Sequence, residues 1–202
     1  MRKLYREFFL FPDIVVLIGL IIVSAAIQAW HGLTWAAIGF IAFGLVTFMF
    51  SEYLTHRFLF HLKPPKHPFF LKLLKRLHYD HHTDPNNLHL LFLPLWYSLP
   101  NLSVLTLIFY LIIGELWLTL AFATGLMTML FLYEWKHYVA HRPIKPISKF
   151  GQWAKKMHIL HHFKNENFWY GVSSPFVDVL FGTLKDEKEV ETSKTAKDLE
   201  RR

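Results

Sequence analysis

The chain has 202 residues, of which 53% are hydrophobic, and it carries a formal net charge of +7, 13 histidines and no cysteine. The lack of cysteine excludes a disulfide framework, thiolate metal ligands and cysteine nucleophiles. The length suits one domain. The apolar residues are concentrated in runs without charge at residues 14–50, 85–114 and 116–133. A helix needs roughly 20 such residues to cross a hydrocarbon core of about 30 Å, so the runs predict membrane spans.

The first apolar run predicts a helical hairpin. His31 and Gly32 interrupt it near its middle, which predicts helices over residues 14–30 and 33–53 joined by a very short turn. Buried helices of a soluble protein are the alternative, but such helices are seldom so long and so free of charge. A signal peptide is not expected, because the run is too long and lacks a convincing cleavage site.

The second block of apolar sequence predicts another hairpin, over residues 99–113 and 116–135, with a Gly-Glu pair between the two helices. Pro94 and Pro100 favour a late start for its first helix, because proline is tolerated at the start of a helix and not in its interior. Four crossings place both ends of the chain and the middle loop on one side of the membrane.

Basic residues flank the apolar runs. They lie before the first run, within residues 57–76 and from Lys136 onward. The positive-inside rule therefore predicts that both termini and the loop between the hairpins are cytoplasmic. Nucleic-acid binding, the usual alternative for a basic protein, is not expected because the charges border membrane spans.

The remaining sequence predicts a helical cap and a tail. Residues 69–82 and 145–162 read as amphipathic helices suited to a membrane surface. Residues 185–202 are charged and lack aromatic side chains, so we expect a flexible tail there. Residues 1–184 are expected to form a single membrane-embedded domain.

Four histidine clusters follow the apolar runs, with the spacings HxxxxH, HxxHH, HxxxH and HxxHH. Residues three or four apart share one face of a helix, so histidines within a cluster converge. Adjacent histidines project about 100° apart, so each HH pair suits two neighbouring ions. The ten candidate metal ligands are His56, His61, His78, His81, His82, His137, His141, His158, His161 and His162.

The number of imidazoles suits two metal ions, because ten are too many for one ion of four to six ligands. Imidazole binds zinc, copper, iron and nickel, so the spacing does not select the metal. His56 and His61 are five residues apart, which is about 140° around an α-helix. They share a site only if the helix ends or distorts there, as the nearby Pro64 and Pro65 suggest.

Three carboxylates are candidates for supporting the ligands. Glu52 lies one turn before His56 and Glu134 lies three residues before His137, so each is placed to accept the second ring N–H of its histidine. Asp80 lies inside the second cluster. The alternative for all three is a solvated or helix-capping carboxylate.

Five further residues are given structural roles. His31 is expected in a turn, His67 in a loop before proline and His89 in a loop, all outside the clusters. Trp169 and Tyr170 are interpreted as anchors at the membrane interface rather than substrate contacts.

The four clusters resemble those of the fatty acid hydroxylase superfamily, which also holds sterol desaturases and carotenoid hydroxylases. Residues 56–65 (HRFLFHLKPP) and 171–184 (GVSSPFVDVLFGTL) are similar to the fatty acid 2-hydroxylase branch. The resemblance covers about residues 50–184. The expected fold is all-α and membrane-integral, with four transmembrane helices in two hairpins and a cytosolic helical cap carrying a histidine-rich di-metal site.

The resemblance implies an oxidoreductase with two iron ions at the ten histidines, which uses dioxygen and two electrons to hydroxylate a fatty-acyl chain of a membrane lipid, at the 2-position in that branch. Zinc can replace iron during purification, but it lacks the redox chemistry that attack on an unactivated C–H bond needs. Many eukaryotic members carry a fused cytochrome b5 domain, whereas only about a dozen residues precede the first helix here. A separate donor of the cytochrome b5 or ferredoxin type is therefore expected.

Two other functions remain open from the sequence. One is a sterol- or carotenoid-type hydroxylase or desaturase on the same scaffold. The other is a membrane metal transporter, which should place its ligands near the bilayer midplane, whereas these clusters lie at helix ends and beyond. The expected location is a bacterial inner membrane or the endoplasmic reticulum, with the active site on the cytoplasmic side.

Overall fold

Four long apolar helices dominate the computed structural model, which describes residues 2–202. All regular elements in that range are helical. The four helices are long and apolar enough to cross a membrane, which confirms the predicted number of spans: Pro12–His31, Trp35–Phe60, Leu88–Ile113 and Leu116–Ala140. The chain divides into two compact units: unit one is Met1–Phe48 with Pro94–Tyr133, and unit two is Met49–Leu93 with Glu134–Arg202.

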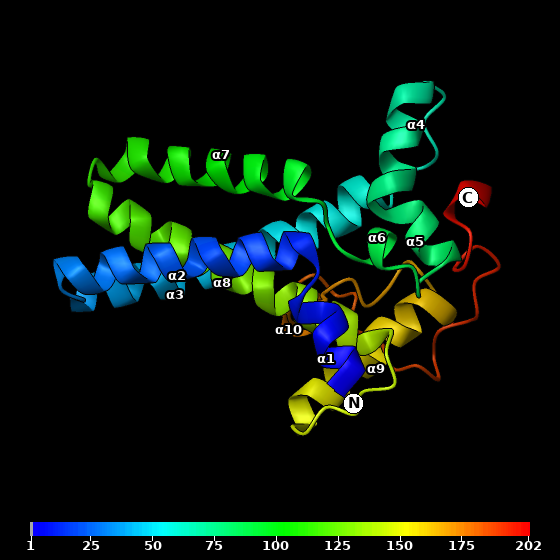
Figure 1. The fold of residues 1–202 in the computed structure, drawn as a ribbon. Helices are drawn as coiled ribbons and strands as arrows, with labels where there is room; N and C mark the ends of the chain where they lie inside the picture. Colours follow the sequence, from blue (N-terminus) through cyan, green and yellow to red (C-terminus); the bar gives the residue numbers. More distant parts are fainter. Residues whose placement is uncertain (1) are drawn as a thin grey trace. The chain divides into compact units, whose positions relative to one another are not determined.

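Unit one contains the short charged helix α1 and two hairpins of apolar helices, each closed by a tight turn (Figure 1). Gly32 and Gly114, each with a positive φ, follow the first helix of the two hairpins. Glycine adopts this backbone conformation without a steric cost, so both predicted interruptions are confirmed. The helices are α1 (Arg2–Phe9), α2 (Pro12–His31), α7 (Leu95–Ile113) and the greater part of α3 (Trp35–Thr55) and α8 (Leu116–Ala140).

Helix α7 begins earlier than the proline positions predict. It starts at Leu95, with Pro94 as its N-cap residue and Pro100 inside the helix. The backbone N–H of Leu95 donates to Oδ2 of Asp13 at 3.3 Å, and the hydroxyl of Ser98 donates to the carbonyl oxygen of Pro94. The bond to Asp13 caps the first turn, and α7 continues through Pro100, which removes one backbone hydrogen bond from the helix.

Helices α3 and α8 approach closely through glycine. A Cβ atom on Gly44 would meet the carbonyl oxygen of Phe122, and one on Gly125 would meet the carbonyl oxygen of Ile41. Small residues at helix contacts let backbones approach in a membrane, where packing replaces the hydrophobic effect as the driving force. Both glycines are therefore required by the contact itself.

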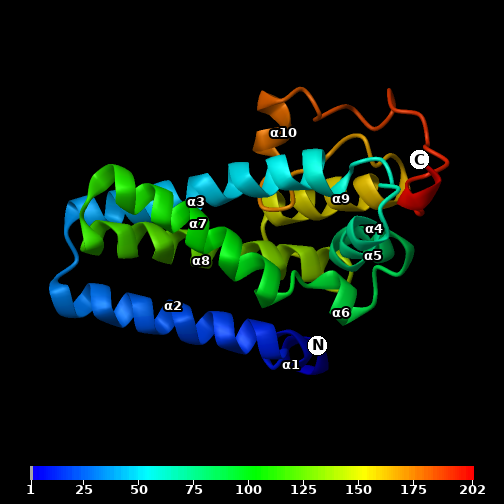
Figure 2. The same cartoon turned by 90° about the horizontal axis from the view of Figure 1, so that it is seen from above.

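Unit two contains the shorter helices (Figure 2). The predicted helix over residues 69–82 is three consecutive segments, of which the middle one is a π-helix. The predicted helix at 145–162 begins later, because the side chain of Ser148 caps Lys149–Phe163. The elements are the π-helix η1 (His56–Phe60), α4 (Pro68–Leu74), the π-helix η2 (Lys75–Tyr79), α5 (Asp80–Thr83), α6 (Leu88–Leu91), α9 (Lys149–Phe163), α10 (Phe176–Leu180) and η3 (Leu199–Arg201).

Residues 185–202, for which the sequence predicts a flexible tail, make defined contacts within unit two. Val190, Ala196 and Leu199 are buried. The backbone N–H of Ser193 donates to the carbonyl oxygen of Lys164 at 2.7 Å. The charged composition of the segment therefore coexists with a buried apolar side.

Replacing Gly125 should destabilise the contact between α3 and α8. We expect Gly125→Ala to lower the free energy of unfolding by about 1–3 kcal/mol, the usual cost of overpacking. Thermal unfolding in detergent micelles measures the change. The matched control is Gly39→Ala on α3, because open space surrounds Gly39. An equal effect of the two substitutions would contradict this account of the contact.

Candidate metal centre

Ten histidine rings converge at two points in unit two. In each group of five, one ring nitrogen per residue lies within 4.8 Å of the other four, and nine of the ten rings are buried. The structure thus brings together all the histidines that the sequence singles out as candidate ligands. The first histidine group is His56, His61, His78, His82 and His161, and the second histidine group is His81, His137, His141, His158 and His162.

Each pair of adjacent histidines is divided between the two groups. His82 belongs to the first group and His81 to the second, while His161 belongs to the first and His162 to the second. Consecutive side chains on a helix project about 100° apart, so the adjacent pairs on α5 and α9 each contribute one ring to the first group and one ring to the second. The two points are therefore held by the same two helices.

A π-helix brings His56 and His61 together. The segment η1 covers His56–Phe60, and the Nε2 atoms of His56 and His61 lie 3.2 Å apart. A π-helix repeats with i→i+5 hydrogen bonds, so residues five apart lie nearly above one another. The distortion that the HxxxxH spacing requires is thereby confirmed.

The spacing of the ring nitrogens fits a metal ion. Two nitrogens bound about 2.1 Å from one ion lie about 3.0 Å apart when their bonds meet at right angles. In the first group the Nε2 atom of His78 lies 2.9 Å from that of His61 and 3.0 Å from that of His82. In the second group the Nε2 atoms of His141 and His158 are 2.9 Å apart.

Backbone carbonyls fix the tautomers of three rings in the first group. Nδ1 of His56 lies 2.6 Å from the carbonyl oxygen of Tyr170. Nδ1 of His82 lies 2.7 Å from the carbonyl oxygen of Ala196, and Nδ1 of His161 lies 2.8 Å from that of Phe168. A carbonyl only accepts, so each Nδ1 carries the proton and each Nε2 presents a lone pair. Convergent lone pairs repel one another unless a cation lies between them, so the donor set fits a metal.

Burial keeps the rings neutral. It lowers the pKa of His82 and of His141 to about 3. Neutral imidazole is the form that binds a metal, so both groups are ready to coordinate at neutral pH. Burial, followed by the charges of neighbouring histidines, also lowers the pKa well below the ordinary value of 6.5 for His61, His78, His81, His158, His161 and His162.

Glu52 supports the site through the backbone. Its carboxylate accepts the backbone N–H groups of Val172 and Ser173, at 3.0 and 3.3 Å. The ring N–H of His56 donates to Tyr170, so the direct bond from His56 to Glu52 that the sequence suggests is replaced by a carbonyl. Glu52 thus anchors the loop that orients His56.

The two other candidate carboxylates, Glu134 and Asp80, make different contacts from Glu52. Oε1 of Glu134 accepts the backbone N–H of Leu93 at 3.0 Å. Asp80 lies 3.7 Å from the ammonium group of Lys75, and both side chains are over one-third exposed. Asp80 therefore takes the solvated role that the sequence leaves open.

The interpretation of Trp169 and Tyr170 as interfacial anchors is wrong, because both are buried. Trp169 has a φ of +58°, a left-handed conformation that is uncommon for a bulky residue. It separates Phe168 and Tyr170, whose carbonyls orient His161 and His56. The local strain therefore coincides with the turn that directs two carbonyls toward the first group.

Asp178 organises the same loop and escapes prediction from the sequence. Its carboxylate accepts the backbone N–H groups of Tyr170 and Gly171 at 2.8 Å each, and the hydroxyl of Thr183 at 2.7 Å. Gly171 leaves no space for a Cβ atom beside Ser174 and Asp178. The stretch that resembles the 2-hydroxylase branch is thus the loop that holds the ligands in place.

Comparison with known proteins gives consistent matches. The model of the fatty acid hydroxylase family matches residues 41–183. The chain is 37% identical to human fatty acid 2-hydroxylase over 150 residues, which cover 72% of this chain and 40% of the relative. It is 33% identical to dihydroceramide fatty acyl 2-hydroxylase FAH2 of Arabidopsis thaliana, covering 79% of this chain and 66% of the relative.

A solved structure shares the fold. The hydroxylase domain of full-length scs7p superposes with a TM-score of 0.79 at 24% identity, covering 89% of this chain and 67% of that chain. The chain spans about two fifths of the length of the human, rat and macaque fatty acid 2-hydroxylases that it matches.

The neutral rings make stability depend on pH. Between pH 6.5 and 3 the unfolded chain protonates His82 and His141, whereas the folded chain does not. The free energy of unfolding should therefore fall as the pH decreases below about 6.5, by about 1.4 kcal/mol per pH unit for each neutral histidine. Thermal unfolding of metal-free protein between pH 8 and pH 5 measures this slope. A His82→Gln variant should show a shallower slope, and equal slopes would contradict the assignment.

Removing Asp178 should loosen the loop. Asp178→Ala leaves two buried N–H groups unpaired, and each costs about 1–3 kcal/mol. We expect a lower midpoint of thermal unfolding and weaker metal binding, because the carbonyl of Tyr170 loses its support. Asp178→Asn keeps one acceptor oxygen and should be intermediate, while the exposed Asp186→Ala serves as the control. An Asp178→Ala protein as stable as this control would contradict the role of Asp178.

Proposed function

The chain belongs to the fatty acid hydroxylase family, and on this premise we propose that it is a di-iron membrane oxygenase that hydroxylates a fatty-acyl chain of a lipid at the 2-position. The observation that carries the proposal is the convergence of ten ring nitrogens into two groups of five. The substrate class and the position follow those of the relatives, which are named as fatty acid or fatty acyl 2-hydroxylases. The proposed active unit extends beyond residues 1–184, because the carbonyl oxygen of Ala196 accepts the ring N–H of His82.

The protein would hold one ion in each histidine group. Two bound iron ions would supply the dioxygen activation and the redox capacity that no side chain offers. The carbonyls of Phe168, Tyr170 and Ala196 keep three rings of the first group in the ligating tautomer. The rings of His56, His61 and Tyr170 pack together with little exposure, which excludes water from the first group.

The membrane delivers the substrate in this proposal. Four apolar helices make the chain a multi-pass membrane protein, so a lipid can reach the metal ions without leaving the bilayer. From the basic residues that border the spans we propose that both ends and the active site lie on the cytoplasmic side of a bacterial inner membrane or the endoplasmic reticulum. Their positive charge suits an acidic electron donor of the cytochrome b5 or ferredoxin type.

Removing one ligand from either group should abolish the reaction. We expect His161→Ala and His81→Ala each to reduce product at least about 100-fold, because the proposed chemistry needs both ions. Mass spectrometry of acyl chains from cells that co-express the protein with a cytochrome b5 or a ferredoxin measures the product, which is heavier by one oxygen. Fragmentation locates the hydroxyl.

The matched control is His67→Asn. His67 lies outside both groups and accepts the backbone N–H of Phe69 at the start of α4, a capping role that asparagine can keep. The control should retain full turnover. Turnover in both ligand variants would contradict the di-metal assignment, and altered sterols or carotenoids with unchanged acyl chains would favour the other enzyme class.

A further inference from the structure

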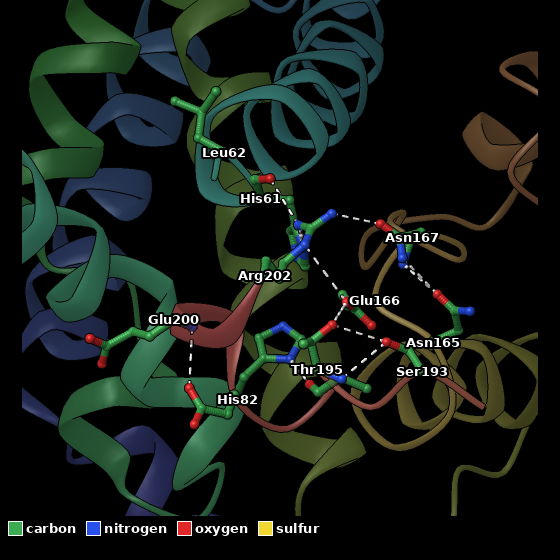
Figure 3. A network of polar contacts seen from close by, with 12 residues as sticks. His61, Leu62, His82, Asn165, Glu166, Asn167, Ser193, Thr195, Glu200 and Arg202 are labelled. Atoms are coloured by element: carbon green, nitrogen blue, oxygen red, sulfur yellow. Dashed lines mark hydrogen bonds and ion pairs between the residues drawn. The ribbon is translucent and has the colours of Figure 1, made fainter. Parts of the chain in front are cut away.

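A segment near the end of the sequence returns to the first histidine group (Figure 3). The carbonyl oxygen of Ala196 accepts the ring N–H of His82 at 2.7 Å. The guanidinium group of Arg202 donates to the carbonyl oxygen of His61 at 2.9 Å. His61 follows the π-helix η1, where backbone carbonyls lack partners within the helix. The segment therefore supports two of the five histidines in this group.

Glu166 ties this segment to the loop after α9. Its side chain is 1% exposed and lies 3.7 Å from Nε of Arg202. It also accepts the hydroxyl of Thr195, and Nη2 of Arg202 donates to Oδ1 of Asn167 at 2.6 Å. Figure 3 shows these groups surrounding the Arg202 side chain. One buried carboxylate thus holds the segment at both Thr195 and Arg202.

The support is asymmetric. Both histidines that the segment contacts, His61 and His82, belong to the first group. The two groups share α5 and α9, but the bonds that the segment makes end on the ring of His82 and on the backbone carbonyl of His61, not on a ring of the second group. A change in the segment should therefore alter one metal site and spare the other.

We propose that Arg202 and Glu166 are positioning residues that hold residues 193–202 against His61 and His82, and so set the metal affinity of the first histidine group without setting that of the second. The proposal rests on the proposed metal function. Residues that orient metal ligands typically change affinity by about 10- to 100-fold when they are replaced. The guanidinium fork matters because it reaches His61, Asn167 and Glu166 together, which an ammonium group does not.

Metal titration against a chromophoric chelator tests the proposal, with zinc as the probe and the full-length protein in detergent. Arg202→Ala should bind one zinc ion as tightly as the wild type and the other about 10- to 100-fold more weakly. Arg202→Lys should weaken the same ion. The matched control is Arg201→Ala, because the neighbouring Arg201 side chain is 79% exposed and pairs with Asp198, three residues earlier.

A double-variant cycle assigns the weakened ion. In a His81→Ala background, which keeps the first group intact, adding Arg202→Ala should weaken the remaining ion. In a His161→Ala background, which disables the first group, adding Arg202→Ala should change nothing. An effect of equal size in both backgrounds, or unchanged affinity in the first, would overturn the proposal.

The Thr195 hydroxyl gives an independent test if Arg202→Ala does not fold. Thr195→Val should weaken the same ion, Thr195→Ser should restore it and the exposed Thr192→Val should have no effect. Equal zinc binding by Thr195→Val and Thr195→Ser would overturn the proposal. If the wild-type protein binds no zinc, the proposed metal function itself fails. If the wild-type protein binds zinc but the variants behave alike, only the positioning role of Arg202 and Glu166 fails.

Discussion

The repulsion among the convergent ring lone pairs of the first histidine group is the constraint on which the site depends. The ring nitrogens of the ten histidines crowd into two groups, and burial disfavours the imidazolium form that could relieve the crowding by sharing a proton. Three rings of the first group donate their only N–H to backbone carbonyls, so the lone pairs on their Nε2 atoms face one another. A cation in the first group turns this unfavourable arrangement into a favourable one, and the folding of unit two should therefore be coupled to metal binding.

The backbone accepts unusual conformations to reach this arrangement. The π-helices η1 and η2 supply His56 and His78 to the same group. Trp169 adopts a left-handed conformation between two carbonyls that orient ligands. Glu52 and Asp178 then hold the loop that follows, through four backbone N–H groups. Strained or rare geometry is thus confined to the places where it directs a ligand.

Much of the fold and the list of candidate ligands could be predicted from the sequence, because both depend on local patterns. Runs without charge specify spans, glycines mark the two turns, and histidine spacing within one helix predicts which rings converge. The prediction of a late start for α7 is wrong because a proline rule overlooks the capping bond that Asp13 accepts from Leu95. Pro100 lies inside α7, and the helix continues through it although proline removes one backbone hydrogen bond.

The supporting residues could not be predicted, because their contacts link distant parts of the chain. Glu52 contacts residues 172 and 173, and His82 contacts Ala196, each across more than 100 positions. Every residue has a backbone carbonyl whatever its side chain, so the sequence does not reveal that the carbonyls of residues 168, 170 and 196 accept hydrogen bonds from ligands. Residues 185–202 read as a tail because charge dominates their composition, while Ala196 and Leu199 are buried.

Anomalous diffraction from crystals of the iron-loaded protein, recorded at the iron absorption edge, tests the central claim most directly. The account predicts two peaks per chain, one among the Nε2 atoms of the first histidine group and one among the ring nitrogens of the second. A single peak shared by the two groups, or peaks bound elsewhere in a well-ordered protein, would contradict it.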